Sequence, residues 1–128
     1  MLLGITTTVG TQIHFPKSSV GVVASYSGGT YYGTVIYATA SQITIVYTSW
    51  DKIIDGTGNG YGVHLANFCV DPNLLALYNA DDAAGRHYLP GVGYNQAVGV
   101  ANTNVVYVAL TDTGQFMDPR DYQDWWRP

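Results

Sequence analysis

Three short segments with the composition of β-strands, separated by turns, lie between residues 20 and 49 and constrain the fold most. Residues 20–26 are apolar and β-branched, residues 27–30 form a turn with two glycines, and residues 31–37 resume the strand pattern. Glycines supply the positive φ that hairpin turns need. A second turn at 38–41 leads to 42–49, where every second residue is large and apolar or aromatic. The pattern predicts an antiparallel three-stranded meander.

The flanking segments extend this β pattern on both sides. Residues 1–15 are typical of one or two extended segments, which Pro16 ends. Residues 63–70 are apolar enough to predict a further strand. Residues 92–101 and 105–111 flank a polar turn, and we expect them to form a closing hairpin.

A single helix is predicted after residue 70. Asp71 followed by Pro72 is typical of a helix N-terminus, because Asp caps the first turn and Pro fits the first helical position. The helix is expected to end near Asn79 or Ala84, before Gly85. Further helices are disfavoured because the chain has no Glu and two Lys, so strong helix formers are scarce.

The fold class that follows is all-β, with one short helix. About seven short strands with glycine-rich turns predict a small antiparallel barrel or sandwich that contains the meander. The chain has 128 residues, the size of one domain. We expect a single β domain over residues 1–114. Residues 115–128 contain two prolines and no useful periodicity, so they are predicted to form an extended C-terminal arm.

Charge excludes several classes of partner. Charged residues make up 11% of the chain and the net charge is −4. A nucleic-acid binder needs a basic face, whereas the five cations here are scattered. No apolar stretch approaches the roughly 20 residues of a membrane span. The first four residues lack the cationic and apolar regions of a signal peptide. We therefore expect a protein made in the cytoplasm, with neither nucleic acid nor membrane as a partner.

No motif marks a catalytic centre. Cys69 is the one cysteine, which excludes an internal disulfide, and we expect it to be a small buried hydrophobe. His14, His64 and His87 lie in separate segments without the spacing of metal ligands. The favoured hypothesis is a protein that is not an enzyme and needs no metal or cofactor. A small hydrolase with a site assembled from His64, Cys69 or His87 is left open.

Aromatic residues in the arm carry the main functional prediction. Tyr122, Trp125 and Trp126 lie in a segment with proline and charged residues, outside the strand pattern. Two adjacent tryptophans are costly to leave in water, at roughly 25 cal/mol per Å² of apolar area. We expect them to be buried either on the β domain of this chain or on a neighbouring protein. The neighbour is the favoured alternative, with Arg120 and Arg127 pairing to acidic groups of that partner.

The segment 20–51 contains four short motifs, which are Val23-Ala24-Ser25-Tyr26, Gly29-Thr30-Tyr31-Tyr32-Gly33-Thr34-Val35, Ile45-Val46-Tyr47 and Trp50-Asp51. In these motifs the segment resembles the core of a Tudor or SH3-like barrel, which implies an SH3-like meander within the fold. This family implies an aromatic cage for a cationic ligand, which Tyr26, Tyr32 and Tyr47 would border. The second aromatic is Tyr where the family commonly has Trp. A ligand-binding module, with such a cage or a glycan-binding surface, is the alternative hypothesis.

In overall character the chain is similar to small structural proteins of tailed-phage virions, such as capsid decoration, cement and adaptor proteins. The likeness rests on the Glu-free composition rich in Gly, Thr, Val and Tyr and on the lack of a catalytic motif. It implies a non-enzymatic protein that is located in the virion and binds capsid or tail subunits, with a homo-oligomer as a further possibility. This is the leading hypothesis of function.

Overall fold

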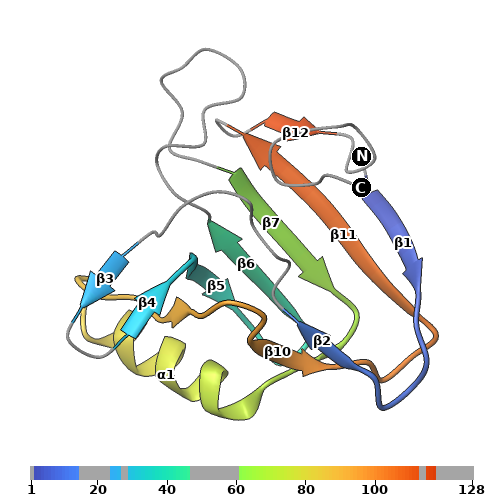
Figure 1. The fold of residues 1–128 in the computed structure, drawn as a ribbon, viewed down its shortest axis with the longest axis horizontal. Helices are drawn as coiled ribbons and strands as arrows, with labels where there is room; N and C mark the ends of the chain where they lie inside the picture. The colour runs from blue at the N-terminus through green and yellow to red at the C-terminus, as the bar shows by residue number, and fades with distance from the viewer. Residues whose placement is uncertain (1, 15–23, 27–28, 47–60, 113–114, 118–128) are drawn as a thin grey trace.

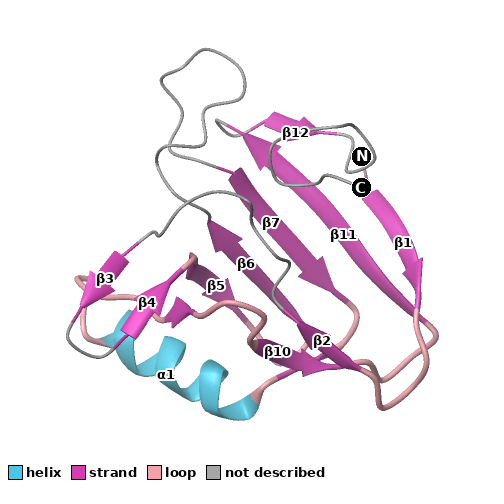
Figure 2. Cartoon of the chain, in the orientation of Figure 1, coloured by secondary structure: helices cyan, strands magenta, loops and turns pink. Residues whose placement is uncertain are grey.

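The computed structural model describes residues 2–14, 24–26, 29–46, 61–112 and 115–117. These residues form two layers, a large antiparallel sheet and a smaller layer that covers one of its faces (Figure 1). They include a single helix, and it is not long and apolar enough to cross a membrane. The all-β prediction with one short helix is confirmed (Figure 2), and the described strands close no barrel.

The large sheet contains seven strands. Its order is β1-β11-β7-β6-β5-β9, and β12 also pairs with β11. The strands are β1 (Leu2–Thr6), β5 (Gly33–Ala38), β6 (Gln42–Val46), β7 (Tyr61–Ala66), β9 (Gly91–Val92), β11 (Val105–Asp112) and β12 (Gln115–Met117). Strand β11 pairs with β7 along one edge, while β1 and β12 share its other edge.

One face of this sheet forms the hydrophobic core. Because side chains alternate along a strand, every second residue of the central strands points to this face. Ile45, Val63 and Leu110 lie opposite one another on neighbouring strands, and all three are almost completely buried. Ile43, Leu65 and Val108 repeat the arrangement one step along the strands.

The second layer covers the core face. It contains a three-stranded sheet of β2 (Gln12–His14), β10 (Ala97–Val100) and β8 (Cys69–Val70), in that order. The helix α1 (Pro72–Ala83) packs against β5 and contributes Leu74 and Tyr78 to the core. Asp71 caps the helix by accepting a hydrogen bond from the Leu74 amide at 2.9 Å, as its sequence predicts.

The predicted meander is divided between two sheets. β3 (Ala24–Tyr26) pairs with β4 (Gly29–Tyr31) in a separate two-stranded sheet, whereas β5 pairs with β6. The strand expected over 31–37 is therefore broken at Tyr32. The break occurs because the chain changes partners there: the Tyr32 amide donates to the Val92 carbonyl at 2.9 Å, and Gly33 pairs with Val92 in β9.

The strand expected over 63–70 is likewise two strands, β7 and β8, in different layers. Asn67, between them, has a φ of 68°. Its side-chain amide donates to the Val105 carbonyl and to Thr103 Oγ1, which holds this corner in place. After this corner the alternation of buried and exposed side chains starts again, so Phe68 and Val70 point inward and Cys69 is exposed. The prediction that Cys69 is buried is wrong for this reason.

The closing hairpin expected between 92–101 and 105–111 is also wrong. Both edges of β10 are already occupied, by β2 and β8, and both edges of β11 are occupied by strands of the large sheet. The chain leaves β10 at Ala101, whose amide donates to the Thr11 carbonyl at 2.8 Å. β11 instead forms a hairpin with β12, which consists of the first three residues of the predicted arm.

Candidate functional site: a free sheet edge and a cavity beside the helix

The residues expected to anchor a partner lie outside the described part of the chain. Tyr122, Trp125, Trp126, Arg120 and Arg127 all follow β12, which ends at Met117. Their predicted role therefore stays a prediction.

The predicted aromatic cage is described in part. Tyr26 lies in β3 opposite Gly29, while its side chain and the whole of Tyr47 are outside the description. Tyr32 is half-buried, and its ring meets that of Tyr94 edge to face, with 5.9 Å between centroids. Tyr94 was not expected at this place, since it is 62 residues further along the chain and its neighbourhood carries no aromatic motif.

Strand β1 forms one end of the large sheet, and its outer edge pairs with none of the described strands. Leu2 and Ile5 are 62% and 46% exposed, and four of the five residues of the strand are exposed. The strand contains neither a charged residue nor proline, and its pairing with β11 runs through five residues without a bulge. Charged residues, proline and bulges are the features by which proteins normally protect a free sheet edge, and β1 has none of them.

The other end of the sheet is different. β9 comprises two residues, Gly91 and Val92, and Val92 is fully buried. A very short terminal strand offers little backbone for a further strand to pair with. The two ends of the same sheet are therefore unequal, and among the described strands β1 presents the longer unpaired edge.

The face of the large sheet turned away from the core, called the outer face here, carries a polar contact across three strands. Thr44, His64 and Ala109 lie opposite one another in β6, β7 and β11. His64 Nδ1 is hydrogen-bonded to Thr44 Oγ1 at 2.9 Å, and His64 Nε2 to Thr111 Oγ1 at 3.0 Å. Burial lowers the pKa of His64, because a charged imidazolium would lose hydration there.

The three residues of the hydrolase hypothesis lie on separate elements. His64 is on the outer face of β7, Cys69 is exposed on β8, and His87 follows the end of α1. Nowhere in the described ranges do three His, Cys, Asp or Glu side chains come together in a group able to hold a metal ion.

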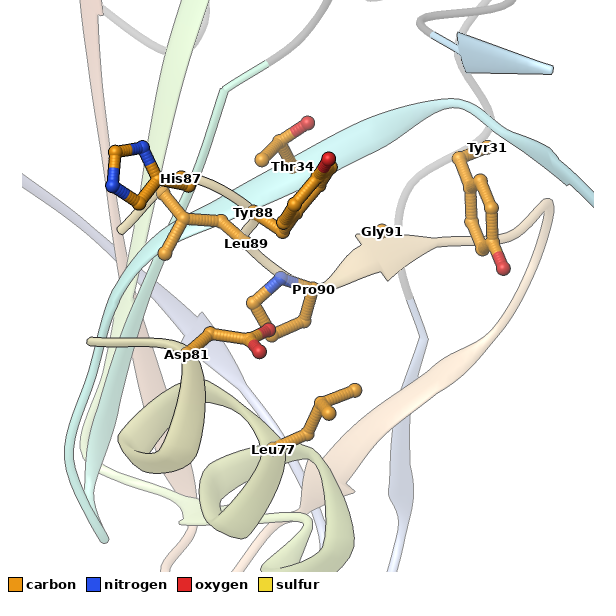
Figure 3. Close-up of a pocket in the computed structure, with 9 residues that line it drawn as sticks. All are labelled: Tyr31, Thr34, Leu77, Asp81, His87, Tyr88, Leu89, Pro90 and Gly91. Carbon is orange, nitrogen blue, oxygen red and sulfur yellow. The ribbon is translucent and has the colours of Figure 1, made fainter. Parts of the chain in front are cut away.

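A cavity of about 330 Å³, called the α1 cavity here, lies beside the C-terminal half of the helix (Figure 3). Three segments of the chain form its wall: β4 and β5, the helix, and the segment that leads into β9. Its lining residues are Tyr31, Thr34, Leu77, Asp81, His87, Tyr88, Leu89, Pro90 and Gly91. A smaller hollow of about 220 Å³ continues from it and shares Asp81, His87 and Tyr88.

A chain reversal after the helix creates this cavity. Gly85 and Arg86 have φ values of 97° and 62°, which turn the chain back along α1. The Arg86 guanidinium fixes the turn, because it donates to Asp82 at 2.5 Å, to the Tyr78 hydroxyl at 3.0 Å and to the Ile36 carbonyl at 2.7 Å. The hydrogen bonds to Asp82 and Tyr78 raise the pKa of Arg86 above its ordinary value.

The two adjacent carboxylates of the helix therefore have different surroundings. Asp82 forms an ion pair with Arg86. Asp81 lines the cavity and is half-buried, and within the described residues its carboxylate has neither an ion pair nor a hydrogen bond. In the sequence, Asp81 and Asp82 are two adjacent carboxylates near a predicted helix end, and nothing indicates that the chain folds back over Asp81.

Comparison of the chain with protein-family models, with curated proteins and with solved structures finds no match.

Proposed function

We propose that this protein is a non-enzymatic structural protein that binds other protein subunits in a large assembly, and that a neighbouring subunit adds a strand to the free edge of β1. The observation that carries the proposal is the unprotected edge itself. A strand with unpaired backbone groups and no charge, proline or bulge readily pairs with another strand.

The composition of the large sheet supports a protein partner. Within its seven strands, Asp112 is the only acidic residue and there is no Lys or Arg. The exposed side chains of β1 are aliphatic or Thr, apart from Gly4. An added strand would cover Leu2 and Ile5 on its two faces, which adds apolar burial to the backbone hydrogen bonds.

Within this proposal we place the assembly in the virion of a tailed phage, with the chain as a capsid decoration, cement or adaptor protein. The support is the composition of the chain. The aromatic arm residues Tyr122, Trp125 and Trp126 would provide a second contact with the same neighbour. Aromatic anchors of this kind commonly dominate an interface, at about 2 kcal/mol or more each.

The test combines particle sedimentation with one substitution in the edge. Material from the natural source is separated on a density gradient, and this chain is followed by mass spectrometry. In parallel, purified chain is added to particles that lack it, as the natural sequence, as Ile5→Lys and as Val9→Lys. Val9 is 67% exposed and follows β1, so Val9→Lys adds the same charge outside the edge strand.

We expect the chain to migrate with a particle in fixed stoichiometry, and Ile5→Lys to lose binding while Val9→Lys keeps it. A chain that stays at the top of the gradient would contradict the structural role. Equal binding by both variants would show that β1 is not the contact. Removal of residues 118–128 tests the arm separately, because it leaves all the described strands in place.

A further inference from the structure

We propose that the α1 cavity binds a primary ammonium group carried on an apolar stem, the chemistry of a lysine side chain or a small alkylamine. The site goes beyond the assembly role proposed above, because it lies at the opposite end of the large sheet from β1, beside β5 and β9. Tyr32, the one residue of the predicted cage whose side chain is described, is not among its described lining residues.

The charge of the cavity lining favours a cationic ligand. Among the described lining residues, Asp81 is the one acidic group, and none is Lys or Arg. Arg86, the one arginine that the structure describes, is already held by Asp82, Tyr78 and the Ile36 carbonyl. Figure 3 shows the Asp81 carboxylate directed from the helix toward Pro90, where a ligand in the cavity would meet it. A half-buried carboxylate with no cation beside it favours a positively charged ligand.

The remaining walls suit a stem of methylene groups. Leu77 lies one helical turn before Asp81 on the same side of α1, and Leu89 and Pro90 are further apolar residues of the lining. Tyr31 and Tyr88 are also lining residues, with Tyr88 80% exposed, and a tyrosine ring attracts a cation that lies over its face. At about 330 Å³ the cavity is at the small end of ligand sites, which fits one side chain or a small amine.

The position of the Tyr31 ring depends on the absence of a side chain at Gly91. A Cβ at Gly91 would lie 2.5 Å from Cγ and from Cδ1 of the Tyr31 ring. The ring therefore rests directly on the Gly91 backbone, and any larger residue would displace it. This contact makes Gly91→Ala a probe of the cavity that leaves every charge unchanged.

The experiment is an NMR titration of the full-length ¹⁵N-labelled chain with Nα-acetyl-lysine-N-methylamide. The matched neutral ligand is Nα-acetyl-norleucine-N-methylamide, which has the same type of stem without the ammonium group. We expect saturable shifts at Asp81, His87 and Gly91 with the lysine compound and binding about tenfold weaker, or absent, with the norleucine compound.

The protein variants are Asp81→Asn and Asp71→Asn. Each removes one carboxylate, but Asp71 lies at the other end of α1 and lines neither hollow, and Asn can replace Asp as the helix cap. We expect Asp81→Asn to weaken binding about tenfold, Asp71→Asn to weaken it much less, and Gly91→Ala to weaken it without a change of charge. Butylamine added as a second probe separates a free amine from a ligand that needs the amide groups.

Equal affinity for the lysine and norleucine compounds would overturn the proposal, as would equal losses in the two Asn variants. Saturation by a neutral methyl glycoside at the same residues would show a glycan site instead. The titration uses the isolated chain and needs no assembly. Ile5→Lys is expected to bind the lysine compound normally, so failure of either proposal leaves the other standing.

Discussion

At the scale of single residues, two close contacts depend on glycine. At Gly62, a Cβ would lie 2.5 Å from Thr111 Oγ1, so the missing side chain makes room for the contact between Thr111 and His64. At Gly99 in β10, a Cβ would lie 2.2 Å from the Cys69 carbonyl oxygen and 2.6 Å from the Phe68 ring. The second layer can approach the core this closely only because position 99 has no side chain.

We predict that Gly99→Ala lowers the free energy of unfolding by about 3 kcal/mol, because backbone and a fully buried ring must both move. Gly93→Ala is the control, since the nearest atom to its Cβ is the end of the Gln96 side chain at 3.5 Å. Urea denaturation of both variants measures the difference. Equal stability of the two would mean that β8 and β10 are not packed as described.

The stability of the fold should depend on pH through His64. Its pKa is lowered in the folded protein, so the unfolded chain binds the proton more readily. The free energy of unfolding is therefore expected to fall as the pH drops below about 6.5, the ordinary pKa of histidine. Above that pH both states are neutral at this residue and its contribution is constant.

Urea denaturation between pH 5 and 8 checks this for the natural sequence and for His64→Gln, which cannot titrate at this position. The difference in stability between the two proteins should change across this range, since other titrating groups are common to both. A constant difference would show that His64 binds protons equally in the folded and unfolded chains.

At the scale of elements, α1 is the part whose position the sequence specifies most directly. Asp71 accepts a hydrogen bond from the Leu74 amide, and Pro72 occupies the first turn. We predict that Asp71→Ala destabilises the protein by about 1 kcal/mol, whereas Asp71→Ser keeps a cap and most of the stability. Thermal denaturation of the two variants checks this, and equal losses would exclude the capping role.

The positions of the strands could be predicted from the sequence, but their pairing could not. The alternation of apolar and polar residues and the glycine turns correctly indicated where most strands lie. Each strand has two edges, however, and the sequence does not indicate which strands pair with them. Tyr32 and Asn67 are points where the chain changes from one sheet to another, and the hydrogen bonds that fix them come from Val92 and from Val105. Local pattern carries no information on such distant partners.

The α1 cavity could not be predicted for a related reason. The cavity is lined by residues from separate elements: Tyr31 from β4, Asp81 from α1 and Gly91 from β9. They meet because Gly85 and Arg86 reverse the chain, and Arg86 is held by the carbonyl of Ile36, 50 residues earlier. The helix end was predictable from Gly85, but the direction that the chain takes afterwards was not.

At the scale of the whole molecule, β11 joins the two ends of the described chain. Residues of β1 pair with Val105 to Ala109, and β12 continues along the same edge of β11 from Leu110. Leu2 lies directly opposite Ala109, with both side chains on the outer face. The integrity of the large sheet therefore depends on a contact between the first strand and one of the last.

A disulfide tests this contact. In a Cys69→Ser background, we predict that Leu2→Cys with Ala109→Cys oxidises readily and stabilises the protein by roughly 2–4 kcal/mol, because it closes a long loop. Leu3→Cys with Ala109→Cys should not form the bond, since Leu3 points to the other face of the sheet. Non-reducing electrophoresis and thermal denaturation distinguish the two. Bond formation in both would indicate a different register.

The pairing of β1 with β11 also has a consequence for synthesis on the ribosome. β1 is made before its partner, which is about 100 residues further along the chain. At about 5–20 residues per second, the ribosome needs roughly 5 to 20 s to reach that partner. Throughout this interval an uncharged, β-prone strand lacks the strand β11 that pairs with it in the folded protein. On a polysome, where several nascent copies are close together, such a strand is exposed to pairing with another copy.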